Sequence, residues 1–380
     1  MSSSLSRRHF LRSSSLAVAG LGLPGLAGVA AAAAPASAAA APAGVAATGP
    51  VLLNFNECPQ GPIPAAMDAV RNVLPASGRY LFGLGRELAT EFATQNALPL
   101  DHVAVYAGSS DPLDRAALAF TSARASIVIP DPTFEAVADT AARHGATVHR
   151  VPLRSDGSHD VRAMAAIAPD AGLIYVCNPN NPTGSVTARA ELDWLLANKP
   201  AGSTLLVDEA YIHYSDERSM LDRVAAGDDL IVLRTFSKLY GMAGLRLGLA
   251  LGRPELLAKL AAYGSNPLPV TAMVAGLASL RDRDVVPTRR RENTALREQT
   301  VRWLEQQGFA CVPSVANCFM VDVGSDGKAF AAAMAERGVV IGRAWPVWPQ
   351  RVRVTVGTPE EMARFREVFA QVAAARSAAA

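Results

Sequence analysis

The sequence predicts an α/β protein with a largely parallel sheet, because short hydrophobic runs alternate with segments of helical periodicity from Val51 onward. Its 380 residues are 50% hydrophobic, and its 25 prolines and 29 glycines are spread along the chain. This length and composition allow a large domain and a smaller one. Several hydrophobic runs end in polar residues, and ligands bind at the carboxyl ends of strands in such sheets.

Strands and helices alternate in the first half of the expected large domain. The segments that predict strands are 102–108, 125–132, 171–184, 203–211 and 229–238, the last three with polar residues at their ends. Helices are predicted over 109–120 and 133–145. In the first of these, Leu113, Ala116 and Phe120 recur at helical spacing, which indicates one buried face.

The C-terminal part predicts a smaller α/β domain behind a long, exposed, arginine-rich helix over 281–308. Its expected pieces are 318–324, 327–342, 351–357 and a closing helix from about Pro359. The predicted organisation is therefore a signal peptide with an Ala-rich linker over 1–45, an N-terminal arm that joins the small domain over 46–75, a large domain over 76–275 and the small domain over 276–380.

The first 45 residues resemble a twin-arginine export signal. They combine Arg7-Arg8 with His9-Phe10-Leu11, a run rich in Gly and Ala, and Ala-Ser-Ala at 36–38. We therefore expect export in the folded state to the periplasm or the medium, or a cytoplasmic protein if the signal is not used. The alternative is a membrane anchor, but Pro24 interrupts the run and no later segment is long and apolar enough to span a bilayer.

Charge and cysteine usage exclude several other classes of protein. The formal net charge is only +2 and no basic stripe or aromatic-rich basic segment is present, so nucleic acid is not an expected partner. The four cysteines, Cys58, Cys177, Cys311 and Cys318, lie far apart in unrelated contexts. This spacing predicts no metal site and no redox motif, and it favours small buried hydrophobes.

One lysine, Lys238, ends the strand segment 229–238 and precedes a glycine-punctuated stretch. The chain has only four lysines among its 36 basic residues, so arginine is the usual choice where a plain positive charge suffices. An amine can lose its proton and form a Schiff base, whereas a guanidinium cannot. A surface lysine is the alternative interpretation of this residue alone.

Other strand ends carry polar residues suited to one ligand site. After 102–108, a glycine turn enters a helix for which Asp111 is the expected N-cap and Pro112 the first residue, an arrangement that binds anions. Asn181 lies in a Pro/Gly turn directly after the hydrophobic part of the segment 171–184. Asp208 follows 203–207, where an unpaired carboxylate would be costly to bury. Each motif also has an ordinary structural interpretation. Residues 108–112 could be a capped helix, and residues 178–184 could be a β-turn. Asp208 could cap a helix, and Arg246 could form a surface ion pair.

In this order, the motifs at 108–111, 178–184, 208–211 and 235–238, with Arg246, resemble those of fold-type I pyridoxal-phosphate aminotransferases, most closely the histidinol-phosphate aminotransferase branch. The likeness extends from residues 54–62 to residues 353–365. It implies a mostly parallel seven-stranded sheet between helices, beside a smaller α/β domain. It also implies pyridoxal 5′-phosphate (PLP) as the cofactor.

The resemblance assigns roles around the cofactor ring. The lysine that matches Lys238 holds PLP as a Schiff base, and the aspartate that matches Asp208 pairs with the protonated pyridine nitrogen. The residues that match Asn181 and Tyr211 bond the ring hydroxyl, and the aromatic side chain that matches Phe134 stacks on the ring. Lys238, Asp208 and Tyr211 are the expected catalytic residues, with Lys238 as general base and acid.

The resemblance also assigns the phosphate contacts. Those within the chain are Ser109, Ser110, Asp111, Thr235, Ser237 and Arg246. In the family, the tyrosine that matches Tyr80 reaches the phosphate of the neighbouring subunit's cofactor. A homodimer with shared sites is therefore expected.

The implied reaction moves an amino group, by a ping-pong mechanism, from an amino acid or a related amine such as histidinol phosphate to a 2-oxo acid. Arg353 matches the arginine that binds the substrate carboxylate, and bidentate recognition suits a guanidinium. Gln60 stands where the family has a substrate-facing tyrosine, and Arg343 and Asn317 are expected on the substrate side.

Three alternatives remain open from sequence. A PLP-dependent decarboxylase, racemase or lyase shares the fold and the lysine. A NAD-dependent dehydrogenase is a second alternative, although the segment 83–88 lacks the third glycine and the preceding strand of a dinucleotide fingerprint. The third is an exported binding protein without catalysis, which would have no use for a Schiff-base lysine.

Overall fold

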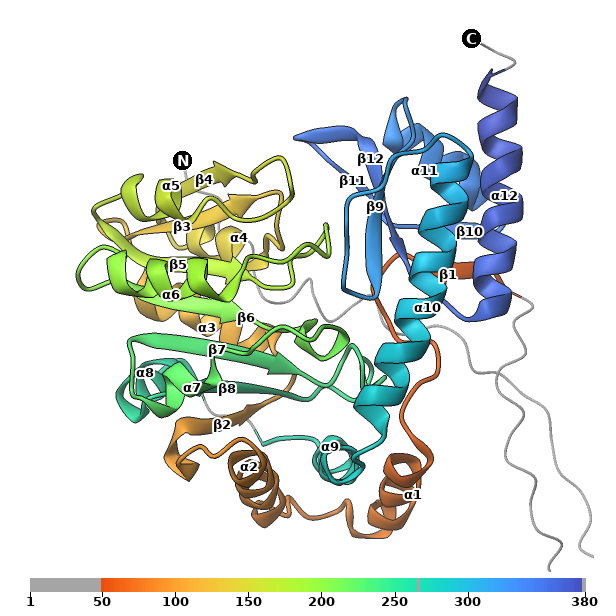
Figure 1. The fold of residues 1–380 in the computed structure, drawn as a ribbon. Helices are drawn as coiled ribbons and strands as arrows, with labels where there is room; N and C mark the ends of the chain where they lie inside the picture. Colours follow the sequence, from red (N-terminus) through yellow and green to blue (C-terminus); the bar gives the residue numbers. More distant parts are fainter. Residues whose placement is uncertain (1–48, 265–266, 378–380) are drawn as a thin grey trace, which may run out of the picture. The chain divides into compact units, whose positions relative to one another are not determined.

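The computed structural model of the chain describes residues 49–264 and 267–377. The predicted signal and linker over 1–45 lie outside these residues. The described residues contain two hydrophobic clusters, a larger one around a seven-stranded sheet and a smaller one around two short sheets (Figure 1). None of the helices in 49–264 and 267–377 combines the length and apolar character needed to cross a membrane.

The seven-stranded sheet has the order β2-β8-β7-β6-β5-β3-β4. Its strands are β2 (Val103–Tyr106), β3 (Ser126–Asp131), β4 (Val148–Pro152), β5 (Ala171–Cys177), β6 (Thr204–Asp208), β7 (Leu230–Thr235) and β8 (Gly248–Gly252). Only β8 runs antiparallel to its neighbours, so the predicted mostly parallel sheet is confirmed. Every residue of β6 and β7 is buried, as expected of central parallel strands that are covered on both faces.

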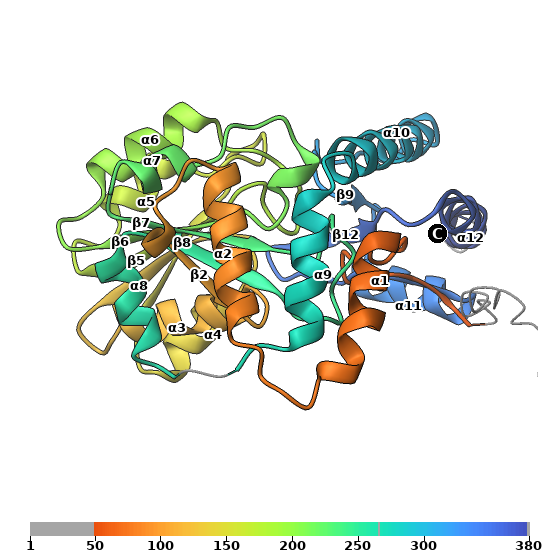
Figure 2. The ribbon, with the colours of Figure 1, turned by 90° about the horizontal axis from the view of Figure 1, so that it is seen from below.

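Helices cover both faces of this sheet; Figure 2 shows α6 and α7 on one side and α3, α4 and α8 on the other. The helices of this part are α1 (Pro64–Val73), α2 (Gly83–Gln95), α3 (Ser110–Phe120), α4 (Ala136–Arg143), α5 (Val161–Ala166), α6 (Arg189–Asn198), α7 (Leu221–Ala225), α8 (Pro254–Ala261) and α9 (Val270–Arg281). Pro64 and Pro254 open α1 and α8, where a missing amide costs no intrahelical hydrogen bond.

The smaller cluster is built on an antiparallel sheet of order β11-β12-β9 and a parallel pair of β1 and β10. Its elements are β1 (Val51–Leu53), β9 (Cys318–Asp322), β10 (Val339–Ile341), β11 (Ala344–Trp345), β12 (Trp348–Thr355), α10 (Val285–Gln306), α11 (Gly327–Glu336) and α12 (Pro359–Ser377). The long helix expected over 281–308 is α10, which begins at Val285 and ends at Gln306, whereas Arg281 is the last residue of the preceding helix α9.

The N-terminal arm contacts both clusters. Its strand β1 pairs with β10 in the smaller part, whereas its helix α1 packs against α9 in the larger part. The chain therefore crosses from one cluster to the other between β1 and α1, and it does so through residues 54–63, which border the site described below. The exact domain limits stay a prediction.

Candidate active site

The carboxyl ends of β5, β6 and β7 and the start of α3 surround a cavity of about 290 Å³. Arg353 of β12 also lines the cavity, so both clusters contribute to it. The predicted site residues that line it are Ser109, Ser110, Phe134, Asn181, Asp208, Tyr211, Thr235, Ser237, Lys238, Arg246 and Arg353. Residues that are hundreds of positions apart in sequence thus meet at one point, as the convergent strand ends predict.

The predicted helix cap at Asp111 is wrong. The helix α3 begins at Ser110 with Ser109 as its N-cap, and the Asp111 carboxylate instead pairs with Arg115, one turn later, at 2.6 Å. The Asp111 side chain lines a separate cavity next to Arg115. This ion pair explains why Asp111 is not the N-cap, because a carboxylate that binds a cation at i+4 cannot also accept the first amides of its own helix.

Four other predicted residues lie outside this cavity. Gln60 and Asn317 line a neighbouring cavity of about 700 Å³, and Glu57 lines both cavities. Arg343 lines a third cavity that also reaches Arg353, and it pairs with Glu135. Tyr80 is 64% exposed and stacks on Phe82 at 5.2 Å between ring centroids. The roles predicted for these four residues stay predictions.

A cradle for a tetrahedral anion lies where α3 begins. Gly108 adopts a left-handed φ of 86°, and a Cβ there would lie 2.2 Å from the Arg246 guanidinium. Arg246 donates to Ser237 Oγ at 3.3 Å and to the Ala243 carbonyl at 3.0 Å. It forms no ion pair with any residue in the described part of the chain. The first amides of an eleven-residue helix point at the same place, so the cradle fits a phosphate group.

Lys238 also lines the cavity, three residues beyond the end of β7. Its Nζ donates to the Phe55 carbonyl at 2.9 Å. Burial, and secondarily the neighbouring Arg353 cation, lower the pKa of the Lys238 amine to about 8. A much larger share of this amine is therefore neutral near neutral pH than in an exposed lysine, which suits it to form a Schiff base.

Asp208 at the end of β6 is only 5% exposed, yet within the described residues no cation lies within ion-pair distance of it. Its Oδ1 accepts the Ala210 amide at 3.1 Å, and its Oδ2 accepts the Tyr175 hydroxyl at 3.2 Å. Burial raises the pKa of the Asp208 carboxyl to about 6, against the opposing effect of these donors. A buried carboxylate with this setting fits a cationic ligand group, such as a protonated pyridine nitrogen.

Hydrogen bonds orient Tyr211 and Asn181, the predicted donors to the ring oxygen, and one of them joins Asn181 to Arg353, the predicted partner of the substrate anion. Tyr211 accepts the Asn56 side-chain amide at 3.0 Å, which leaves its own O–H free to donate into the cavity. Asn181 Oδ1 accepts Arg353 Nη1 at 2.6 Å, which directs the Asn181 NH₂ group the other way. Arg353 also donates to the Asn54 carbonyl, and its Nε is buried without a partner. Arg353 is thus a fixed cation with a donor to spare.

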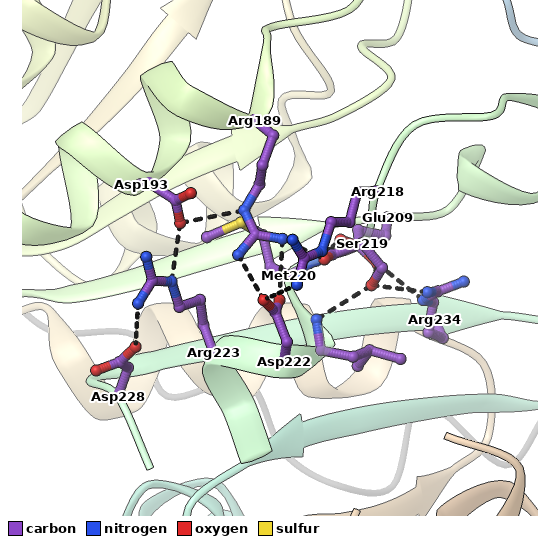
Figure 3. A network of polar contacts seen from close by, with 11 residues as sticks. Arg189, Asp193, Glu209, Arg218, Ser219, Met220, Asp222, Arg223, Asp228 and Arg234 are labelled. Atoms are coloured by element: carbon purple, nitrogen blue, oxygen red, sulfur yellow. Dashed lines mark hydrogen bonds and ion pairs between the residues drawn. The ribbon is translucent and has the colours of Figure 1, made fainter. Parts of the chain in front are cut away.

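A polar network around Glu209 links the ends of β6 and β7 (Figure 3). Glu209, next to Asp208, pairs with Arg234 of β7 at 2.9 Å, and both side chains are at least 91% buried. Glu209 also accepts the Ser219 hydroxyl at 2.7 Å and the Met220 amide at 2.8 Å. This buried pair fixes the strand ends that carry Asp208 and Thr235.

Comparison with known proteins assigns the family. The model of the family "Aminotransferase class I and II" matches residues 48–369. The chain belongs to this aminotransferase family. The aminotransferase is 37% identical to the histidinol-phosphate aminotransferase of Symbiobacterium thermophilum, over 84% of this chain and 89% of the relative. It is 34% identical to the aromatic amino acid aminotransferase of Cutibacterium acnes, over 84% of this chain and 92% of the relative.

The fold of the aminotransferase is also that of solved relatives. The crystal structure of histidinol-phosphate aminotransferase from Sinorhizobium meliloti, in complex with pyridoxal-5′-phosphate, superposes with a TM-score of 0.80 at 24% identity, over 86% of this chain and 91% of that one. The predicted fold type is confirmed. The family and the named relatives likewise confirm a PLP-dependent transaminase, which sets aside the decarboxylase, racemase, lyase, dehydrogenase and binding-protein alternatives.

Sequence reasoning missed several residues of the site of this aminotransferase. Phe55, Glu57 and Cys177 line the cavity, and Tyr175 lies behind Asp208. The first two belong to the segment 54–62, whose likeness to the family points to the site. Tyr175 and Cys177 lie on the same face of β5 because side chains alternate along a strand. Since Asn181 follows this strand and was predicted to lie in the site, the end of β5 could have been expected near the site as well.

Proposed function

We propose that the chain transfers the amino group of an α-amino acid with a bulky, uncharged side chain to a 2-oxo acid. The observation that carries this proposal is the meeting of Lys238, Asp208 and Arg353 in one cavity, where none of the three has an ion-pair partner among the described residues. Three unpaired ionisable groups in one partly buried space are costly unless ligands complete them. PLP and the carboxylate of an amino acid are the ligands that supply the missing charges.

The residues divide between holding the cofactor and moving a proton. The start of α3, Thr235, Ser237 and Arg246 would hold the phosphate, and Asp208 would hold a proton on the ring nitrogen. When bound, PLP supplies a sink for the electron pair that the substrate Cα releases. Lys238 Nζ is placed to take the proton from that Cα, since its lowered pKa of about 8 lies near the operating pH of most enzymes.

Arg353 would bind the substrate carboxylate, because its guanidinium lines the cavity and has one buried N–H without a partner. The second arginine on this side, Arg343, is already neutralised by Glu135, which lies next to Phe134. An acidic side chain on the substrate would have to compete with Glu135 for this cation. The observation therefore favours a donor with an uncharged side chain, and the aromatic amino acid aminotransferase among the relatives supports that choice.

A second candidate donor is histidinol phosphate, which the name of another relative suggests. In that case Arg353 would bind the phosphate of the substrate in place of a carboxylate. The two candidate donors differ in whether they need Arg343. A dianionic phosphate would be stabilised by a second free cation beside Arg353, whereas a carboxylate bound by the Arg353 guanidinium needs no second cation. The Arg343–Glu135 pair is the reason for ranking the amino acid first.

A donor screen tests the proposed function. The purified protein is incubated with PLP, 2-oxoglutarate and, in turn, phenylalanine, tyrosine, histidine, aspartate and histidinol phosphate, and glutamate is measured. We expect the most glutamate with phenylalanine or tyrosine. Glutamate with histidinol phosphate alone would reverse the ranking of donors. Release of carbon dioxide without glutamate from any donor would refute transamination.

We also propose a homodimer in which Tyr80 completes the partner's site. Tyr80 lies outside the cavity of its own chain and is 64% exposed beside exposed Phe82, although aromatic side chains of this size are usually covered. Light scattering on a sizing column should give twice the chain mass. Tyr80→Phe should weaken PLP binding without dissociating the dimer, and a monomeric wild type would contradict the proposal.

Export by the twin-arginine route is a further proposal that rests on Arg7, Arg8 and the residues after them. Cell fractionation of the full chain should place it outside the cytoplasm. Arg7→Lys combined with Arg8→Lys should retain it in the cytoplasm if that route is used. A wild-type chain found only in the cytoplasm would contradict the proposal.

A further inference from the structure

Tyr175 is a completely buried tyrosine whose hydroxyl contacts the site from behind. It lies on β5, next to β6 in the sheet, and its side chain has 0% exposure. The register places Cys177 opposite Asp208, so Tyr175 lies two residues further back. From there its O–H reaches Asp208 Oδ2 at 3.2 Å. A phenylalanine would fill the same space, so packing alone does not explain the hydroxyl.

The hydroxyl can act only as a donor to Asp208. Burial, together with the nearby Cys177 thiol and Asp208 carboxylate, raises the pKa of Tyr175 well above its ordinary value, so it keeps its proton. The ionisable groups that face Asp208 are Lys238 from beyond β7, Glu209 from its own strand end, and Tyr175 and Cys177 from β5. Among these, Tyr175 donates the side-chain hydrogen bond to the carboxylate, and Ala210 donates the backbone one.

The two donors fix both oxygens of Asp208. With Oδ1 on the Ala210 amide and Oδ2 on the Tyr175 hydroxyl, the plane of the carboxylate cannot rotate without losing a hydrogen bond. Such bonds also favour the ionised form of a buried carboxyl group, which burial alone would discourage. A neutral carboxylic acid could not hold a proton on a facing ring nitrogen, so the state of Asp208 decides how well it can serve the cofactor.

We propose that Tyr175 is a positioning residue that orients Asp208 and keeps it ionised for the pyridine nitrogen of the cofactor. This inference rests on the proposed function, because it assigns Asp208 to that nitrogen. It adds a residue behind the site that touches neither the cofactor nor the substrate and acts only through the carboxylate.

The test measures PLP affinity of the apoprotein and so does not depend on turnover. PLP is titrated into wild type, Tyr175→Phe, Asp208→Asn and the double variant between pH 6 and pH 9. Tyr106→Phe is the matched control, because this buried tyrosine lies on β2, separated from β6 by β8 and β7. Thermal unfolding of each apoprotein separates loss of affinity from loss of fold.

Removal of the Tyr175 hydroxyl should raise the Kd for PLP about tenfold at neutral pH, the loss expected for one hydrogen bond to a charged group. The pH at which affinity falls on the acid side should move upward by about one unit. Both effects should vanish in the Asp208→Asn background, where the double variant should bind PLP as the single Asp208→Asn variant does.

The possible results distinguish failure of the proposed function from failure of the role proposed for Tyr175. A wild type that does not bind PLP would overturn the proposed function and this inference with it. Wild-type binding with an unchanged Tyr175→Phe would overturn only the inference. An equal loss with and without Asp208 would show that the tyrosine is merely structural. If the double variant does not fold, the position of the acid limb in the single variant still decides, because a packing defect would not shift it.

Discussion

Gly248→Ala tests the phosphate cradle through a backbone contact. Gly248 is the first residue of β8, and it packs directly against the turn that begins α3. A Cβ at this position would lie 2.4 Å from the Ser109 amide nitrogen and 2.5 Å from the Gly108 carbonyl carbon. Contacts of a Cβ essentially never fall below 3.0 Å, so the turn has to move by about 0.6 Å or more.

The size of the effect follows from what the turn carries. Its amides and the Ser109 and Ser110 side chains line the cavity on the side of Arg246. A shift of half an ångström or more misaligns at least one hydrogen bond to a dianionic phosphate, which costs about 1.5–3 kcal/mol. We therefore expect the Kd for PLP to rise about 10- to 150-fold. Crowding of the backbone should also lower the free energy of unfolding by about 1–3 kcal/mol.

Fluorescence titration of the apoprotein with PLP, with a parallel thermal unfolding curve, measures both quantities. Gly244→Ala is the matched control, because Gly244 precedes β8 in the same stretch of chain and a Cβ there meets nothing within 4 Å. The control should bind PLP as the wild type does. A Gly248→Ala protein with wild-type affinity for PLP would refute the assignment of the cradle.

Three further outcomes follow from the geometry. Glu209→Gln should lower the free energy of unfolding by about 3–5 kcal/mol, because it leaves the Arg234 guanidinium buried without its counter-charge. Arg353→Lys should raise KM for the amino donor at least tenfold with a smaller change in kcat, because an ammonium cannot form the bidentate pair with a carboxylate. The rate at which PLP joins the apoprotein should rise from pH 6, reach half of its maximum near pH 8 and level off above about pH 9, because Lys238 becomes neutral through its lowered pKa of about 8 while Asp208 is already ionised above about 6.

Each of these outcomes has its own control. Chemical unfolding of Glu209→Gln is compared with Glu217→Gln, an exposed neighbour, and equal stability of the two would contradict the role of the buried pair. Steady-state kinetics of Arg353→Lys are compared with those of Arg343→Lys, which should change KM less. Stopped-flow mixing with PLP is repeated on Lys238→Arg, and a rate that still rises through pH 8 in that variant would assign the pH dependence to another group.

The sequence predicts the fold well where hydrophobic segments are long and end abruptly. The strands β5, β6 and β7 are buried along almost their whole length, and each is followed at once by polar residues that have no place in a core. Parallel strands bring such ends to one edge of the sheet, so the meeting of Asn181, Asp208 and Lys238 followed from the sequence once the strands were assigned.

Other parts of the structure depend on tertiary contacts that local patterns do not carry. The strand β8, "GLALG", is fully buried but has two glycines and no β-branched residue, so its propensity does not mark it as a strand. Gly248 allows the close approach to Gly108 and Ser109, and Gly252 lies against Leu230 and Ile231 of β7. Likewise, Asp111 pairs with Arg115 and therefore does not form the predicted helix cap. Gln60 lines the neighbouring cavity because of the path that the N-terminal arm takes between the two clusters.

The choice between lysine and arginine along this chain now follows from the chemistry of the site. Under the proposed function, Arg246 and Arg353 would each bind an anion whose charge does not change during the reaction, and a cation that never loses its proton serves best there. Lys238 needs the opposite property, and the same burial that would destabilise any cation lowers its pKa to about 8. An arginine at position 238 would keep the positive charge and lose the function. In a chain with only four lysines, the one that lines this cavity is thus the position where arginine could not replace it.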